Sequence, residues 1–162
     1  MSTPIYESDH DRQMQHDVAQ ALGIMWRSTP ILAPPLAQHD YAMCRYDARD
    51  DKLYAAAYLE IKCRSTLHLP FWVSLSKWMY LASLSETTNC PAYVAIHARD
   101  TGLIHYAKVS GRPPEIVRGG RTDRPSDPKA IEDLAAIPAH LIMIAGRLPT
   151  SPISRPSDQP LT

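Results

Sequence analysis

Along this chain the spacing of apolar residues changes several times, and each spacing predicts a different element. Residues 8–23 carry apolar side chains three or four positions apart, between a Ser or Asp cap and a closing glycine, with acidic residues in the first turn. Residues 70–86 repeat this spacing and begin with a proline, which the first turn of a helix accepts. We therefore expect two amphipathic helices.

Four runs of β-compatible residues form two antiparallel hairpins, each around a short polar loop. The residue before the loop of the second hairpin, His97, is expected to face His105 as a pair on the surface. Residues 26–37 contain three prolines, which favours an irregular or edge segment. Residues 137–144 can return as a short strand or cover the core. The hairpin runs are residues 41–46 with 53–62, and residues 91–97 with 103–109.

This order of elements predicts an α/β fold with a mixed central β-sheet flanked by the two helices. At 162 residues the chain is long enough to build one core and fits one domain, which we place at residues 1–148. Residues 149–162 are rich in proline and poor in apolar side chains, so we expect a disordered tail. Glycine, arginine and proline over residues 110–125 predict a loop.

The charge of the chain is balanced overall, with 17 Lys and Arg against 17 Asp and Glu. Any attraction to a polyanion must therefore come from local clusters, such as the arginine-rich segment 104–124. The three cysteines lack C-x-x-C spacing, which argues against a disulfide framework and a zinc site. Neither a signal peptide nor a membrane-spanning run is recognisable. We expect a cytoplasmic protein, in the host cell if a phage encodes it, with no membrane partner.

The strand of the first hairpin that follows the loop presents an acid and an amine on one face. Glu60 and Lys62 lie two residues apart, so their side chains point the same way, while Leu59 and Ile61 face a core. Such a pair can bind a hard cation and orient water once a second carboxylate lies close. By itself the tripeptide E-x-K is equally well explained as a surface charge pair.

The register of the first hairpin supplies a second carboxylate. If the loop is centred near residue 50, Asp40 lies directly opposite Glu60 and on the same face of the sheet. A shift by one residue would separate the two carboxylates. The other pairs that this register predicts are Tyr46 with Tyr54 and Ala42 with Tyr58.

With these features the sequence resembles the PD-(D/E)XK nuclease superfamily, in particular its small phage and prophage members. His39-Asp40 and Glu60-Ile61-Lys62 resemble its two signature pieces, and the likeness covers about residues 7–145. The resemblance implies a restriction-endonuclease-like core with the element order α-β-β-β-α-β. The glutamate that many members carry on the first helix has three candidate counterparts in this chain, namely Glu7, Asp11 and Gln15.

The resemblance implies a metal-dependent deoxyribonuclease in phage DNA replication, recombination or repair. Asp40, Glu60 and the carbonyl of Ile61 would bind Mg²⁺ or Mn²⁺, which prefer oxygen ligands. Lys62 would orient or deprotonate the attacking water and would complete a catalytic set with the two acids. The resemblance also allows a homodimer. The residues expected to contact DNA are Arg64, Ser74, Lys77, Arg121 and Arg124.

Two interpretations from other classes stay open. A non-catalytic nucleic-acid-binding or interaction protein would keep the fold for its basic surface, and a structural phage component would need neither metal nor DNA. Salt-sensitive DNA binding separates the nuclease and the non-catalytic binding protein from the structural component. Stabilisation by Mg²⁺ or Mn²⁺ that disappears with Asp40→Ala or Glu60→Ala is expected of the nuclease alone.

Overall fold

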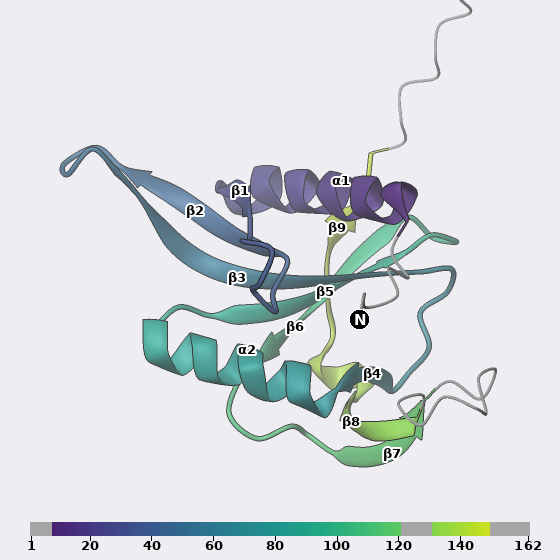
Figure 1. Cartoon of the computed structure of the whole chain (residues 1–162). Coiled ribbons are helices and arrows are strands. Elements are labelled where there is room, and N and C mark those ends of the chain that lie inside the picture. Colours follow the sequence, from purple (N-terminus) through teal and green to yellow (C-terminus); the bar gives the residue numbers. More distant parts are fainter. Residues whose placement is uncertain (1–7, 121–130, 150–162) are drawn as a thin grey trace, which may run out of the picture.

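Two helices pack on opposite faces of a six-stranded sheet in the computed structural model, which describes residues 8–120 and 131–149 (Figure 1). The helices are α1 (Asp9–Trp26) and α2 (Leu75–Thr88), and a short 3-10 helix, η1, spans Ala139–Leu141. The strands are β1 (Thr29–Leu32), β2 (Tyr41–Asp47), β3 (Lys52–Arg64), β4 (Phe71–Ser74), β5 (Ala92–Ala98), β6 (Leu103–Val109), β7 (Ile116–Gly120), β8 (Ile131–Ile137) and β9 (Met143–Arg147).

The central sheet has the order β1-β2-β3-β5-β6-β9. It is mixed, because β3 and β5 run parallel and every other pair of neighbouring strands in this sheet is antiparallel. The predicted α/β class with a mixed sheet flanked by two helices is therefore confirmed. Both predicted hairpins are present as β2–β3 and β5–β6. The proline-rich segment forms β1 at one edge of the sheet.

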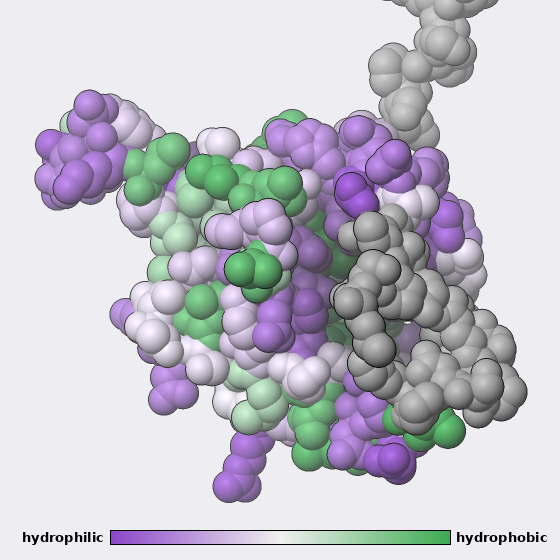
Figure 2. Space-filling view, viewed as in Figure 1, coloured by the Kyte–Doolittle hydropathy of each residue, from purple (hydrophilic) through white to green (hydrophobic). Residues whose placement is uncertain are grey.

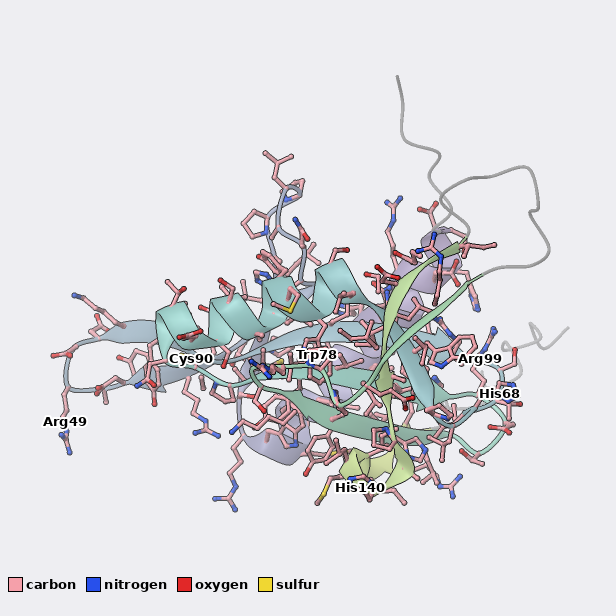
Figure 3. The ribbon with its side chains drawn as sticks, turned by 90° about the horizontal axis from the view of Figure 1, so that it is seen from below. Arg49, His68, Trp78, Cys90, Arg99 and His140 are labelled. Carbon is pink, nitrogen blue, oxygen red and sulfur yellow. The ribbon has the colours of Figure 1, made fainter. Side chains whose placement is uncertain are left out.

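Each helix closes one hydrophobic core against the sheet. Beneath α1, Val18 and Leu22 pack with Leu59 and Ile61 of β3. Beneath α2, Trp78 is buried with residues of β5 and points from the helix toward the sheet (Figure 3). Successive side chains of β3 thus enter different environments, and Glu60 and Lys62 lie on the face covered by α2. Within the described ranges, no helix is both long and apolar enough to cross a membrane.

The first helix begins as predicted but continues beyond Gly23. Ser8 caps it through a reciprocal pair of hydrogen bonds with Asp11, at 3.1 and 3.0 Å. The helix ends at Trp26, and the following residue, Arg27, caps it in a left-handed conformation with φ 51°. Gly23 is needed for close packing instead, since a Cβ atom there would lie 2.7 Å from the carbonyl oxygen of Ser28.

The prediction that the second helix begins at residue 70 was wrong. Residues 71–74 form strand β4, in which Phe71 and Val73 are buried and Trp72 is exposed. This alternation is typical of a strand with one covered face, and β4 pairs with β8. The helix proper starts after Ser74, whose hydroxyl oxygen accepts a hydrogen bond from the Lys77 amide at 3.2 Å.

The predicted loop over residues 110–125 is wrong over Ile116–Gly120, which forms β7. This strand pairs with β8 and completes a smaller sheet with the order β4-β8-β7. Arg118 lies opposite Asp133, and its guanidinium approaches that carboxylate at 3.3 Å. The segment predicted to return over residues 137–144 is divided between the end of β8, η1 and β9. Arg121, Arg124 and all but the first residue of the expected tail at 149–162 lie outside the described residues.

The predicted surface pair of histidines is also wrong. His97 lies opposite Ile104, and His105 lies opposite Ile96, so the two imidazoles are one residue out of register. Directly paired residues share a face and adjacent ones alternate, which places the two rings on opposite faces of the sheet. His97 is only 4% exposed, and burial lowers its pKa.

Candidate active site

The hairpin register brings the predicted carboxylates together. Tyr41 lies opposite Leu59 and Ala42 opposite Tyr58, as expected, and Asp40 directly precedes the first paired residue of β2. The Asp40 amide donates to the Leu59 carbonyl at 2.8 Å. The Ile61 amide in turn donates to Asp40 Oδ2 at 2.7 Å, which fixes the Asp40 carboxylate beside β3.

The same register is wrong at the far end of the hairpin. A β-bulge between Met43 and Cys44 shifts the pairing by one residue, so Tyr46 lies opposite Leu53 and not opposite Tyr54. The bulge lies between the loop and the site, and the hairpin end nearer to Asp40 keeps the expected pairing. Figure 2 shows that the tip of this hairpin is hydrophilic.

Glu60 is a buried carboxylate held between two lysines. It is 2% exposed, and Lys62 Nζ lies 2.7 Å from its Oε1. Lys77 Nζ, from the first turn of α2, lies 3.1 Å from Oε2 and also donates to the Gln38 carbonyl. The contact with Oε2 is an ion pair without hydrogen-bond geometry, and among the described residues Oε2 has no hydrogen-bond partner. Lys77 was predicted to contact a DNA phosphate, and in this structure its ammonium contacts the Glu60 carboxylate.

Asp40 is the acid of the site whose pKa is clearly raised. Burial and the neighbouring Glu60 charge raise its pKa to about 6, although the hydrogen bond from Ile61 acts in the opposite direction. The adjacent His39 is stacked on Tyr80, with its Nδ1 3.0 Å from the Tyr80 hydroxyl, and burial lowers the pKa of the imidazole. Two acids with mutual repulsion lie at the centre of this partly buried cluster.

The raised pKa of Asp40 predicts a pH-dependent stability in metal-free protein. Between about pH 4 and pH 6 the folded state binds more protons at Asp40 than the unfolded state, so the free energy of unfolding falls as the pH rises. The expected loss is roughly 2 to 3 kcal/mol. Urea denaturation in EDTA checks it, with Asp40→Asn as the control that keeps an acceptor for Ile61 and lacks the titration. Parallel curves for the two proteins would contradict this account.

A cavity of about 470 Å³ opens beside the acid pair. Four residues predicted from the sequence to act in catalysis or to contact DNA line it, namely Lys62, Arg64, Ser74 and Lys77. The guanidinium of Arg64 lies 5.7 Å from the centre of the Phe71 ring. Three further lining residues were not predicted from the sequence, namely His68, Trp72 and Glu132. The sequence pattern could have indicated Trp72, because it is the outward-facing position of a short run of alternating residues. The prediction of a helix over this run hid that alternation.

Of the three first-helix candidates, Asp11 has a contact within its own helix cap. Glu7 lies outside the described residues, Asp11 binds Ser8 in the helix cap, and Gln15 is half-buried. Over the part of the chain that the structure describes, no group of three or more His, Cys, Asp or Glu side chains could hold a metal ion. Among the described residues, a metal site here would use the two carboxylates together with main-chain or water oxygens.

The donor set fits a hard divalent cation. Asp40 and Glu60 are oxygen donors, and burial together with the charge of Glu60 raises the pKa of Asp40. Glu60 Oε2 is buried and lacks a hydrogen bond to any described residue, so it retains acceptor capacity. Mg²⁺ commonly takes one or two carboxylates and keeps several waters, and a pair of acids therefore suffices.

A comparison with protein families identifies the family of the chain. A family model described as "Phage putative PDDEXK endonuclease" matches residues 1–143. Among solved structures, the chain is similar to Hjc of Archaeoglobus fulgidus, a Holliday junction resolvase from an archaeal hyperthermophile. That similarity has a TM-score of 0.42 and 16% identity, and it covers 59% of this chain and 73% of the other. No curated protein matches. Because the family model matches most of its length, the chain belongs to the phage family of PD-(D/E)XK endonucleases.

Proposed function

We propose that the protein is a deoxyribonuclease that depends on Mg²⁺ or Mn²⁺ and acts in phage DNA replication, recombination or repair. The observation that carries this proposal is the position of Asp40 beside Glu60, with Lys62 Nζ 2.7 Å from Glu60 Oε1. Membership of an endonuclease family supports it. Hydrolysis of a phosphodiester needs positive charge at the phosphate and an oriented water, and this cluster has the residue types for both.

Each residue of the cluster has a proposed role in the reaction. Asp40, Glu60 and the carbonyl of Ile61 hold the divalent cation. When bound, that cation supplies positive charge that polarises the phosphate and makes water more acidic. Lys62 orients the attacking water and stabilises the negative charge that grows on the phosphate. The hydrogen bond from the Ile61 amide keeps the Asp40 carboxylate in place before substrate arrives.

Binding of the DNA backbone is proposed for the basic wall of the cavity. Lys77 and Arg64 supply positive charge there, and Ser74 supplies a hydroxyl at the amino-terminal end of α2, where the helix dipole favours anions. Arg121 and Arg124 remain part of this proposal. A domain at residues 1–148 and a homodimer complete it, and sedimentation of the full chain with and without DNA tests the dimer.

The non-catalytic alternative has one specific observation in its favour. Lys77 lies 3.1 Å from Glu60 Oε2, so two lysines already balance this acid without a metal. A protein that used the fold for binding alone would need no further charge on Glu60.

A cleavage assay separates these functions. Linear, circular, flapped and four-way DNA are incubated with Mg²⁺, Mn²⁺ or EDTA, and the products are analysed for 5′-phosphate and 3′-hydroxyl ends. We expect cleavage of at least one substrate with either metal and none in EDTA. Salt-sensitive binding without cleavage of any substrate would instead support the non-catalytic alternative.

A further inference from the structure

The cavity beside the acid pair offers more than a site for a phosphate. Its volume of about 470 Å³ falls in the range of pockets that enclose a small organic molecule. Basic side chains of β3 and α2 line the part next to Glu60, whereas Trp72 and Leu134 of the smaller sheet line another part. The cavity thus combines cationic and apolar walls, and this combination suits a ligand with an anionic and a flat apolar part.

Trp72 provides the flat wall. Its side chain is 49% exposed, whereas its neighbours in β4, Phe71 and Val73, are 5% and 2% exposed. The indole lies over Gly119 of β7, where an added Cβ atom would be 3.5 Å from Cζ3 and 3.7 Å from Cη2 of the ring. A half-exposed indole supported by the sheet beneath it is a suitable surface for stacking an aromatic base.

The cationic wall is continuous with the proposed catalytic residues. Lys62 and Lys77, which contact the two oxygens of Glu60, both line the cavity, and Arg64 lies two residues further along β3. A group held against Trp72 would therefore have its phosphate near the acid pair. Glu132, which also lines the cavity, could accept hydrogen bonds from the amino groups of a base.

We propose that this cavity receives an unpaired nucleotide of the DNA strand, with its base stacked on Trp72 and its phosphate beside Lys62, Lys77 and Arg64. This inference deepens the proposed nuclease function and rests on it for the identity of the polymer. A base inside an intact duplex is stacked on both sides and must be extruded before it can meet the indole, which costs free energy. Flaps, gaps and single strands present such a base already, so the protein prefers them to blunt duplex.

Binding measurements in EDTA test this preference without cleavage. Fluorescence anisotropy is recorded for the full chain with a single strand, a blunt duplex and a duplex that carries a short single-stranded flap. We expect Trp72→Ala to weaken binding of the single strand and the flap by about tenfold, which corresponds to a stacking energy of about 1.4 kcal/mol. Binding of the blunt duplex should change by less than about twofold. Trp72→Phe keeps an aromatic ring and should retain most of the preference.

Tyr54→Ala is the matched control, because Tyr54 is a 50% exposed aromatic residue near the tip of the β2–β3 hairpin. Figure 3 places Arg49 of that tip and His68 of the cavity at opposite ends of the molecule. Equal loss of affinity for all three DNAs in Trp72→Ala, or no loss for any, would overturn the nucleotide pocket. Because these measurements need no cleavage, a Trp72-dependent flap preference in a protein that cuts nothing would uphold the pocket and refute the nuclease proposal.

Discussion

Replacing Lys62 by alanine should reduce DNA cleavage by roughly 10²- to 10⁴-fold. The Lys62 ammonium lies at the wall of the cavity, 2.7 Å from Glu60 Oε1, and alanine cannot orient water or stabilise charge on a phosphate. The protein should still fold, because Lys77 remains beside the buried Glu60 carboxylate. Single-turnover cleavage with Mg²⁺, together with urea denaturation of the same sample, separates the loss of chemistry from any loss of stability.

Lys52→Ala is the matched control for this experiment. Lys52 belongs to the same strand, but its side chain is exposed. It lies opposite Asp47 in the strand register, next to the hairpin loop. We expect it to cleave at the wild-type rate. Wild-type cleavage by Lys62→Ala would contradict the role proposed for this lysine, and an equal loss in Lys52→Ala would point to a general effect of charge.

Replacing Glu60 by glutamine should abolish both cleavage and stabilisation by divalent metal. The change keeps the size of a side chain that is 2% exposed and removes the charge that two lysines and the proposed cation share. Removing one partner of a buried ion pair commonly costs about 3 to 5 kcal/mol, so the free energy of unfolding should also fall. Thermal unfolding with and without Mg²⁺ measures both effects.

In the wild-type protein, Mg²⁺ at about 100 times its dissociation constant should add about 2.7 kcal/mol of stability. Glu60→Gln should show no such gain, whereas Glu86→Gln, a change at an exposed position of α2, should keep it. Undiminished stabilisation by Mg²⁺ in Glu60→Gln would place the metal elsewhere and would remove the main support for the proposed site.

Two lysines compensate the buried Glu60 carboxylate in the metal-free protein. A carboxylate removed from water is costly unless cations or hydrogen bonds compensate it. Lys62 and Lys77 provide this compensation from two elements, β3 and α2. A divalent cation held by Glu60 and Asp40 would supply the positive charge that Lys77 now supplies to the Glu60 carboxylate. The Lys77 ammonium already lies at the wall of the cavity that would receive a phosphate.

The sequence by itself determined the central hairpin and the relation between Asp40 and Glu60. Residues of one hairpin are linked by a short loop, so loop position and the two-residue period of strands predict which side chains meet. The prediction was correct for the pair Ala42 and Tyr58, and it was wrong for Tyr46, because a bulge is a one-residue irregularity that the alternation of apolar residues did not reveal. The motif residues were therefore recognisable from short-range spacing alone.

Only the tertiary structure decided what surrounds the acid pair. Strand β4 exists because Phe71 and Val73 pair with Ile137 and Ala135 of β8, more than sixty residues further along the chain, and local spacing alone favoured a helix there. The same long-range pairing brings Trp72 over Gly119 and encloses the cavity. The sequence determined the acids and their lysine because Asp40 directly precedes β2 and the other two residues lie in the neighbouring strand β3. The contact with Lys77 and the aromatic wall depended on packing between distant segments, which no short-range pattern encodes.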